Sequence, residues 1–238
     1  MEFKMENNRK LFIAGGICAI LWPVFTLGFY VAYPIAAGNT IQALPGGQAD
    51  YAIRLAELGQ RSTIITLEWL YAGLPLITWP LFLGLYRLLH KRNQNNLSLL
   101  AVWFGLFGSA SMVINGTINP TLSHSLGEAY VNAGSEAEGA AVLSILFAMM
   151  YWYQSLNILA SLLYQVCVGL FGMALIMSRT WMIRGWIGVI GAFLALIGKV
   201  IPGPAGFSNI TWTGLAYIIW PVAVGIGLLK HKGKDADE

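Results

Sequence analysis

One acidic residue inside a long apolar run is the first candidate for chemistry. Glu68 lies five residues after Thr63, where the apolar run 63–88 begins. At 1.5 Å per residue, Glu68 would lie about 8 Å from the outer end of a helix that crosses a membrane. An ionisable residue inside a span is costly in hydrocarbon and therefore indicates a functional site. We expect Glu68 to face the interior of a helix bundle, as a ligand-binding or proton-binding group.

Lys199, near the outer end of a later apolar run, is a candidate partner for this acid. An ion pair between Glu68 and Lys199 would neutralise both charges. Alternatively, the lysine extends to the lipid headgroups and the carboxylate is satisfied by water. A purely structural pair and a ligand or proton role both remain open at this stage.

Two stripes of polar side chains accompany Glu68. The first follows one helix face at four-residue spacing and consists of Ser111, Asn115 and Asn119. The second belongs to the next long apolar run and consists of Gln154, Asn157, Ser161 and Gln165. Polar groups in lipid need partners, so both stripes are expected to face the bundle interior, as a pocket lining or as interhelical hydrogen bonds. The predicted cavity opens outward and is lined by Glu68, Asn115, Asn119, Gln154, Asn157 and Lys199.

Histidine and cysteine give little indication of a metal or haem site. The three histidines lie outside the apolar runs, and Cys18 and Cys167 are far apart in the chain. His124, with Glu128 four residues later, is a candidate metal or proton site in an outer loop, with a solvated loop histidine as the alternative. We therefore predict no resident metal or cofactor, and we assign no catalytic residue.

The composition identifies the class of protein. Of 238 residues, 57% are hydrophobic and 11% are charged, which excludes an ordinary water-soluble domain and a disordered chain. The 14 basic residues are spread along the chain, so the net charge of +3 is no sign of nucleic-acid binding. The chain is predicted to be an all-α integral membrane protein with membrane lipids as its surroundings.

Helix-length apolar runs predict one membrane domain, residues 1–238, with six spans. A span needs about 20 mainly apolar residues. The predicted spans are residues 11–33, 63–88, 97–118, 152–177, 182–201 and 210–229. Residues 34–62 and 119–139 are expected as outer loops, residues 136–150 as an extra outer-face helix before the fourth span, and residues 230–238 as a polar tail. Pro75 and Pro80 predict a break within the second span.

The distribution of basic residues predicts the orientation. With the N-terminus inside, the outer segments carry only Arg54, Arg61 and Lys199, and the other eleven basic residues are inside. The positive-inside rule therefore places both termini in the cytoplasm. The expected location is a bacterial inner membrane.

The C-terminal half resembles a known group of proteins. The segment Trp181 to Gly198 reads WMIRGWIGVIGAFLALIG, with a basic residue and tryptophan before a glycine-rich span. With the basic end Gly225 to Lys232 and the outer loop before the fourth span, it is similar to the domain-of-unknown-function 4386 family of bacterial multi-pass membrane proteins. The resemblance implies a six-span bacterial membrane protein and carries no activity.

Three functions agree with these observations. The first is small-molecule binding or transport through the outward polar cavity. The second is a non-catalytic accessory or assembly protein, in which the polar stripes only pack helices. The third is a membrane enzyme acting on a lipid, with Glu68 or His124 as acid or base. Enzymes of that kind usually cluster several acids or histidines, so the enzyme is the least favoured of the three.

Overall fold

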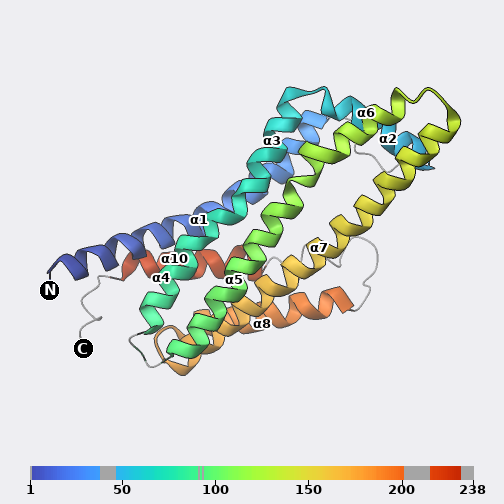
Figure 1. Ribbon diagram of the computed structural model, residues 1–238. Coiled ribbons are helices and arrows are strands. Elements are labelled where there is room, and N and C mark those ends of the chain that lie inside the picture. The colour runs from blue at the N-terminus through green and yellow to red at the C-terminus, as the bar shows by residue number, and fades with distance from the viewer. Residues whose placement is uncertain (1, 38–46, 91, 93, 201–214, 232–238) are drawn as a thin grey trace. The chain divides into compact units, whose positions relative to one another are not determined.

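The computed structural model describes residues 2–37, 47–90, 92, 94–200 and 215–231, and every regular element in those ranges is a helix (Figure 1). The all-α prediction is confirmed. Two of the described apolar helices are short, Met182–Gly198 and Ala216–Lys230. The helices long and apolar enough to cross a membrane are Asn8–Ala37, Ser62–His90, Asn96–Val131 and Glu136–Met177. By helix length and composition, the chain is built as a membrane protein.

The second of these stretches is interrupted where the sequence predicts a break. It consists of α3 (Ser62–Gly73), the 3₁₀ turn η2 (Leu74–Ile77) and α4 (Thr78–His90). Pro75 lies in this turn. Proline cannot donate the main-chain hydrogen bond of a continuous helix, which explains the interruption. The Thr78 hydroxyl donates to the Pro75 carbonyl oxygen at 2.6 Å. The break at Pro75 is confirmed, whereas Pro80 lies inside α4 without interrupting it.

The two segments expected as outer loops are largely helical, which corrects the prediction. The described part of residues 34–62 includes α2 (Gly47–Gly59), and residues 119–139 include the π-helical turn η3 (Asn119–Ser123) and α6 (His124–Val131). The elements η3 and α6 follow α5 (Asn95–Gly116). Pro120 suggests a turn, but proline is tolerated in the first turn of a helix, so the chain continues through it as helix.

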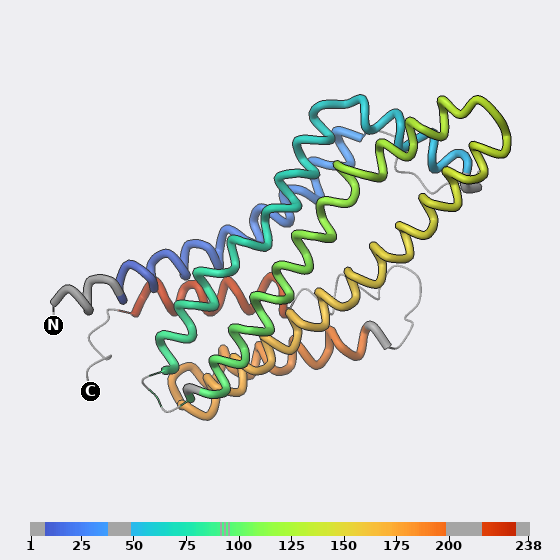
Figure 2. The backbone as a smooth tube through the Cα atoms, in the orientation of Figure 1, coloured from blue at the N-terminus to red at the C-terminus, as the bar shows by residue number. Residues whose placement is uncertain are grey.

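A separate outer-face helix before the fourth span is not seen. Residues 136–150 continue without a break into the rest of α7 (Glu136–Met177), which Figure 2 shows as one uninterrupted coil. Its 42 residues extend over about 63 Å at 1.5 Å per residue. The segment 151–157 contains no glycine, proline or charge that would end a helix, which explains the continuity.

The remaining helices lie at the two ends of the chain. The N-terminal helix is α1 (Glu2–Ala37), and the C-terminal elements are α8 (Met182–Val200), η4 (Leu215–Ile219) and α10 (Trp220–Lys230). These elements overlap the segments predicted as the first and fifth spans and residues 215–229 of the sixth. Residues 201–214, where the sixth span is predicted to begin, and most of the predicted tail lie outside the described residues.

The chain divides into two compact units. The first unit is Met1–Phe25, Pro75–Ala110 and Ala160–Glu238, and the second is Thr26–Leu74 and Ser111–Leu159. In the first unit, small residues allow helices to pack closely. A methyl group added at Gly108 would lie 3.1 Å from the Tyr164 main-chain nitrogen.

The second unit contains the elements around Glu68. Within it, α2 lies alongside α6 (Figure 1), and Gly127 of α6 makes this approach possible. A methyl group added at Gly127 would lie 2.6 Å from the Ala52 carbonyl oxygen and 2.6 Å from the Ala56 main-chain nitrogen. A buried apolar cluster joins α2 to α7 and consists of Ala52, Leu55 and Leu146.

Candidate functional site

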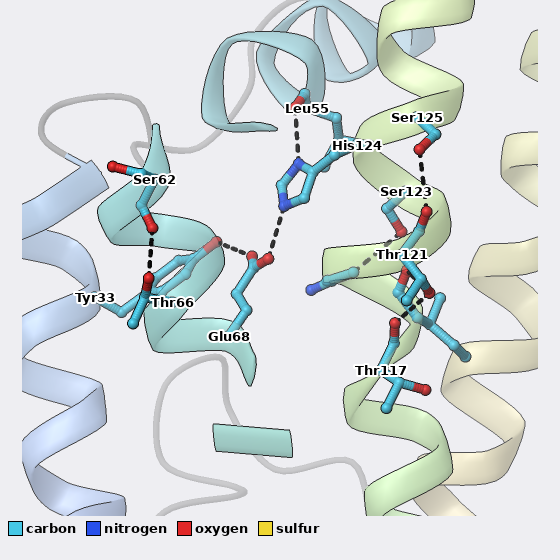
Figure 3. Close-up of polar contacts among 12 residues, drawn as sticks. Tyr33, Leu55, Ser62, Thr66, Glu68, Thr117, Thr121, Ser123, His124 and Ser125 are labelled. Carbon is cyan, nitrogen blue, oxygen red and sulfur yellow. Dashed lines mark hydrogen bonds and ion pairs between the residues drawn. The ribbon is translucent and has the colours of Figure 1, made fainter. Parts of the chain in front are cut away.

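Glu68 is at the centre of a buried hydrogen-bond chain in the second unit. The residue is 4% exposed, and each of its carboxyl oxygens has a partner. The Tyr33 hydroxyl, from α1, donates to Oε1 at 2.9 Å, and Nε2 of His124 lies 2.7 Å from Oε2 (Figure 3). A carboxyl group paired in this way can be buried at much lower cost than an isolated one.

His124 opens α6 and is held through its other ring nitrogen as well. Nδ1 lies 2.8 Å from the Leu55 carbonyl oxygen on α2 (Figure 3). A carbonyl oxygen can only accept a hydrogen bond, so Nδ1 carries a hydrogen. Gly59 makes room for the ring, since a methyl group at this position would lie 2.7 Å from Cβ of His124.

This geometry determines how many protons the pair holds. One further hydrogen lies between Nε2 of His124 and Oε2 of Glu68, because two acceptors would repel each other at 2.7 Å. It belongs either to an imidazolium facing a carboxylate or to a carboxylic acid facing a neutral imidazole. Both forms have zero net charge, so neither leaves an uncompensated ion in the interior. Adding or removing one proton would create a net charge at a buried position.

A second set of contacts holds Tyr33 in place. Nη1 of Arg61, just before α3, donates to the carbonyl oxygens of the last two residues of α1 at 3.3 and 3.1 Å. A cation at the C-terminal carbonyls also interacts favourably with the dipole of the helix. Tyr33 packs against a buried apolar cluster that consists of Ala37, Leu58 and Ile64.

Aromatic rings also pack where α1 meets α3. The ring of Phe29 stacks on that of Tyr71, with centroids 4.1 Å apart and planes inclined by 21°. Its centroid lies 5.1 Å from that of Tyr33. The hydroxyl oxygens of Tyr30 and Tyr71 are 3.5 Å apart. These rings are half-buried except for that of Tyr30, which is exposed.

Two further tyrosines, from α2 and α7, are within electrostatic range of the acid. Burial, followed by the charges of Tyr153 and Glu68, raises the pKa of the Tyr51 hydroxyl above its ordinary value. Tyr153 interacts electrostatically with both Tyr30 and Glu68. Both Tyr51 and Tyr153 are half-buried.

The site offers few ligands for a metal ion. Glu68 and His124 supply two donor side chains, and across the described ranges no group of three or more histidine, cysteine, aspartate and glutamate side chains is placed to hold a metal.

One family model matches this chain. It is the model described as "Domain of unknown function (DUF4386)", and it matches residues 9–230. The chain belongs to the DUF4386 family. The match covers most of the chain, so the resemblance seen in the C-terminal half extends to the segments that supply Tyr33, Glu68 and His124. No curated protein and no solved structure matches the chain.

The structure brings only some of the predicted site residues together in the second unit. Glu68 and Asn115 are buried there, and Asn119 is half-buried and accepts a hydrogen bond from the Ser123 hydroxyl at 3.2 Å. Oδ1 of Asn115 has no hydrogen-bond partner among the described residues. Figure 3 shows Glu68 directed to His124.

The remaining predicted residues are not part of this chain of hydrogen bonds. Gln154 and Asn157 are exposed, so the structure does not bring them to Glu68, contrary to the inward face predicted for this stripe. Lys199 lies in α8, but its side chain is outside the described part of the chain, and the expected pair with Glu68 therefore stays a prediction.

The sequence alone does not indicate Tyr33 as a member of the site, and it places His124 in an outer loop with Glu128 rather than beside Glu68. In the structure, Ser123, His124 and Gly127 are buried. Ser123 and Gly127 are small residues four positions apart, and this spacing is the signal that could have indicated a packed helix.

Proposed function

We propose that this protein binds or transports a small molecule, and that the Tyr33–Glu68–His124 chain is its proton-exchanging site. The observation that carries the proposal is the buried contact between Oε2 of Glu68 and Nε2 of His124, which are 2.7 Å apart and must share a hydrogen. Ionisable groups at such depth are expensive to keep in a membrane protein and commonly mark ligand pathways and proton relays.

The number of protons held by the Glu68–His124 pair gives this site a way to respond to a ligand. The pair is neutral with its shared hydrogen and charged without it. Because a net charge is costly in a poorly solvated site, a proton is gained or lost most easily when a ligand of compensating charge enters or leaves. Binding and proton exchange are thereby coupled through one carboxyl group.

The composition of the site favours binding over catalysis. Enzymes that act on lipids usually cluster several acids or histidines, whereas the chain of hydrogen bonds described here contains one acid, Glu68, and one histidine, His124. The lipid-enzyme alternative is therefore less well supported, and the accessory role is the outcome expected if no ligand binds.

We further propose six spans in a bacterial inner membrane, with both termini in the cytoplasm. The four long apolar helices, together with Met182–Gly198 and Ala216–Lys230, supply six candidate crossings. The eleven basic residues expected inside, against three outside, support this orientation. In this orientation the Glu68 site lies in the outer half of the bundle.

Thiol labelling of intact cells tests the orientation. In a background with Cys18→Ala and Cys167→Ala, single cysteines at Asp50 and Glu136 are expected to react with an impermeant thiol reagent. Cysteines at Arg92 and Lys234 are expected to react only after the cells are opened. Labelling of the second pair in intact cells, or none of the first, would show the orientation to be wrong.

A stability screen tests the binding function. Purified protein in detergent is heated with small cations, anions and neutral compounds, and the midpoint of unfolding is measured. At least one class is expected to raise the midpoint of the wild type but not that of Glu68→Gln, which has lost the exchangeable proton. Glu128→Gln, at an exposed glutamate of α6, is the matched control and is expected to respond as the wild type does.

Two results would count against the binding function. Either no compound class stabilises the wild type, or every stabilising compound acts equally on Glu68→Gln. The accessory role would then be the better description, with the buried pair serving helix packing alone.

A further inference from the structure

Tyrosines on three helices of the second unit lie on the faces that pack around the Glu68–His124 pair. Tyr33 on α1 donates its hydroxyl to Glu68. Tyr51 on α2 lies one helical turn before Leu55, the residue whose carbonyl oxygen bonds His124, and therefore on the same helix face.

The third ring comes from α7. Leu146 of α7 packs in the same buried cluster as Leu55, and Tyr51 packs against that cluster. Tyr153 follows Leu146 by seven residues, or two helical turns, and so shares its face. The face of α7 that carries Tyr153 is therefore the face that packs against α2 in this cluster.

The chemistry of this arrangement favours a positive charge. The face of an aromatic ring carries negative potential and attracts a cation within about 6 Å of its centre. The three tyrosines are half-buried, so each is only partly covered by protein, and Glu68 is 4% exposed. Partly exposed aromatic rings combined with an acid can recognise ammonium ligands.

We propose that the small molecule bound at this site is an organic cation, held by the rings of Tyr33, Tyr51 and Tyr153 and by the carboxylate of Glu68. This inference rests on the function proposed above and specifies its ligand class. The ligand is a substituted ammonium or similar monocation small enough to lie among the rings.

Binding of the cation releases one proton. The hydrogen shared by Glu68 and His124 leaves to solvent, Glu68 remains as a carboxylate, and His124 remains neutral with its hydrogen on Nδ1. The carboxylate then has no hydrogen bond to Nε2 and turns toward the cation. The site is neutral before the exchange and neutral after it, so cation and proton compete for one negative charge.

We expect the other charged side chains described in the second unit to take no part in this exchange. In the described part of α1 and α3 within the second unit, Glu68 is the only charged side chain. Arg61 is bonded to main-chain carbonyl groups of α1, and Arg54 on α2 is half-buried. The acidic side chains of α2, α6 and the start of α7 are exposed: Asp50, Glu57, Glu128, Glu136 and Glu138.

A matched pair of probes tests the charge requirement. Choline and 3,3-dimethylbutan-1-ol have the same shape and differ in one atom, a positively charged nitrogen against a neutral carbon. Calorimetric titration of the purified wild type in detergent is expected to show choline binding and none or far weaker binding of the alcohol. In weak buffer, choline is expected to release one proton per molecule bound, and the alcohol none.

Variants at Tyr153 separate the ring from its hydroxyl group. Tyr153→Leu removes the aromatic face and is expected to weaken choline binding by about twofold to thirtyfold, the range of one cation–π contact. Tyr153→Phe keeps the ring and is expected to bind choline nearly as well as the wild type. Tyr151→Leu, at a residue that is 70% exposed on the same helix, is the control and is expected to have no effect.

Each result decides one point. Equal binding of choline and the alcohol, or no proton release, would overturn the cation assignment, as would unchanged choline binding in Tyr153→Leu. If only neutral or anionic compounds stabilise the wild type in a Glu68-dependent way, the ligand class is wrong but the binding function stands. If no class of compound stabilises the wild type, the binding function itself fails.

Discussion

Replacement of His124 by leucine is expected to lower the free energy of unfolding by about 3–5 kcal/mol, the usual cost of removing one partner from a buried charged pair. Glu68 would keep its bond from Tyr33 but would have no partner at Oε2. Glu68→Gln is expected to cost far less, about 1 kcal/mol or below, because the glutamine amide can donate to Nε2 of a neutral His124 while its carbonyl oxygen accepts from Tyr33. The two substitutions, although made in the same pair, should therefore differ strongly in their effect on the free energy of unfolding.

Unfolding of the purified protein in mixed micelles by a denaturing detergent measures both effects. Glu68→Met combined with His124→Leu is expected to recover part of the loss, since an apolar pair leaves no unpaired charge. Glu128→Leu, at an exposed position of the same helix, is the control and should change the free energy of unfolding by less than about 0.5 kcal/mol. A His124→Leu variant as stable as the wild type would show that the pair is not held as described.

Local sequence patterns could predict the class of the protein and the burial of Glu68. Apolar runs of helix length predict the helices, and Pro75 predicts the break between α3 and α4, because both depend on neighbouring residues. The burial of Glu68 follows from the cost of exposing an acid in hydrocarbon. These properties depend on residues close together in the chain, so a single sequence is enough to predict them.

The partners of Glu68 could not be predicted in the same way. His124 is 56 residues away in the chain, and Tyr33 is 35 residues away, so helix periodicity cannot place either beside it. Pro120 makes the segment before His124 resemble a loop, although proline in a first turn does not prevent a helix. The pairing depends on how α2, α3 and α6 pack, which is decided by small residues such as Gly59 and Gly127.

The stripe of α7 shows the opposite error. Gln154 and Asn157 share a helical face with Ser161 and Gln165, and the pattern predicted that all four are buried. The structure buries Ser161 and Gln165 in the first unit but exposes Gln154 and Asn157 in the second. A polar stripe shows which side of a helix is polar. It does not show whether another helix covers that side along its whole length.

Gly127→Ala is expected to destabilise the protein by about 1–3 kcal/mol, the usual cost of forcing an extra group into a packed interface. The added methyl group would lie 2.6 Å from two main-chain atoms of α2, and main-chain atoms cannot turn aside as a flexible side chain can. To fit the methyl group, α2 must move away from α6. The Leu55 carbonyl oxygen would move with it and weaken its hydrogen bond to Nδ1 of His124.

This variant tests whether the contact between α2 and α6 maintains the proton site. Unfolding in mixed micelles measures the loss of stability, and proton release on choline addition measures the loss of the site; both are expected to fall together. Gly28→Ala is the matched control, because no atom lies within 4 Å of the added methyl group in the middle of α1. Alanine is the better helix former, so this control is expected to be neutral or more stable by up to about 1 kcal/mol. If Gly127→Ala lost stability but kept full proton release, the contact would matter for packing and the position of His124 would have to be fixed by Glu68 and Tyr33 alone.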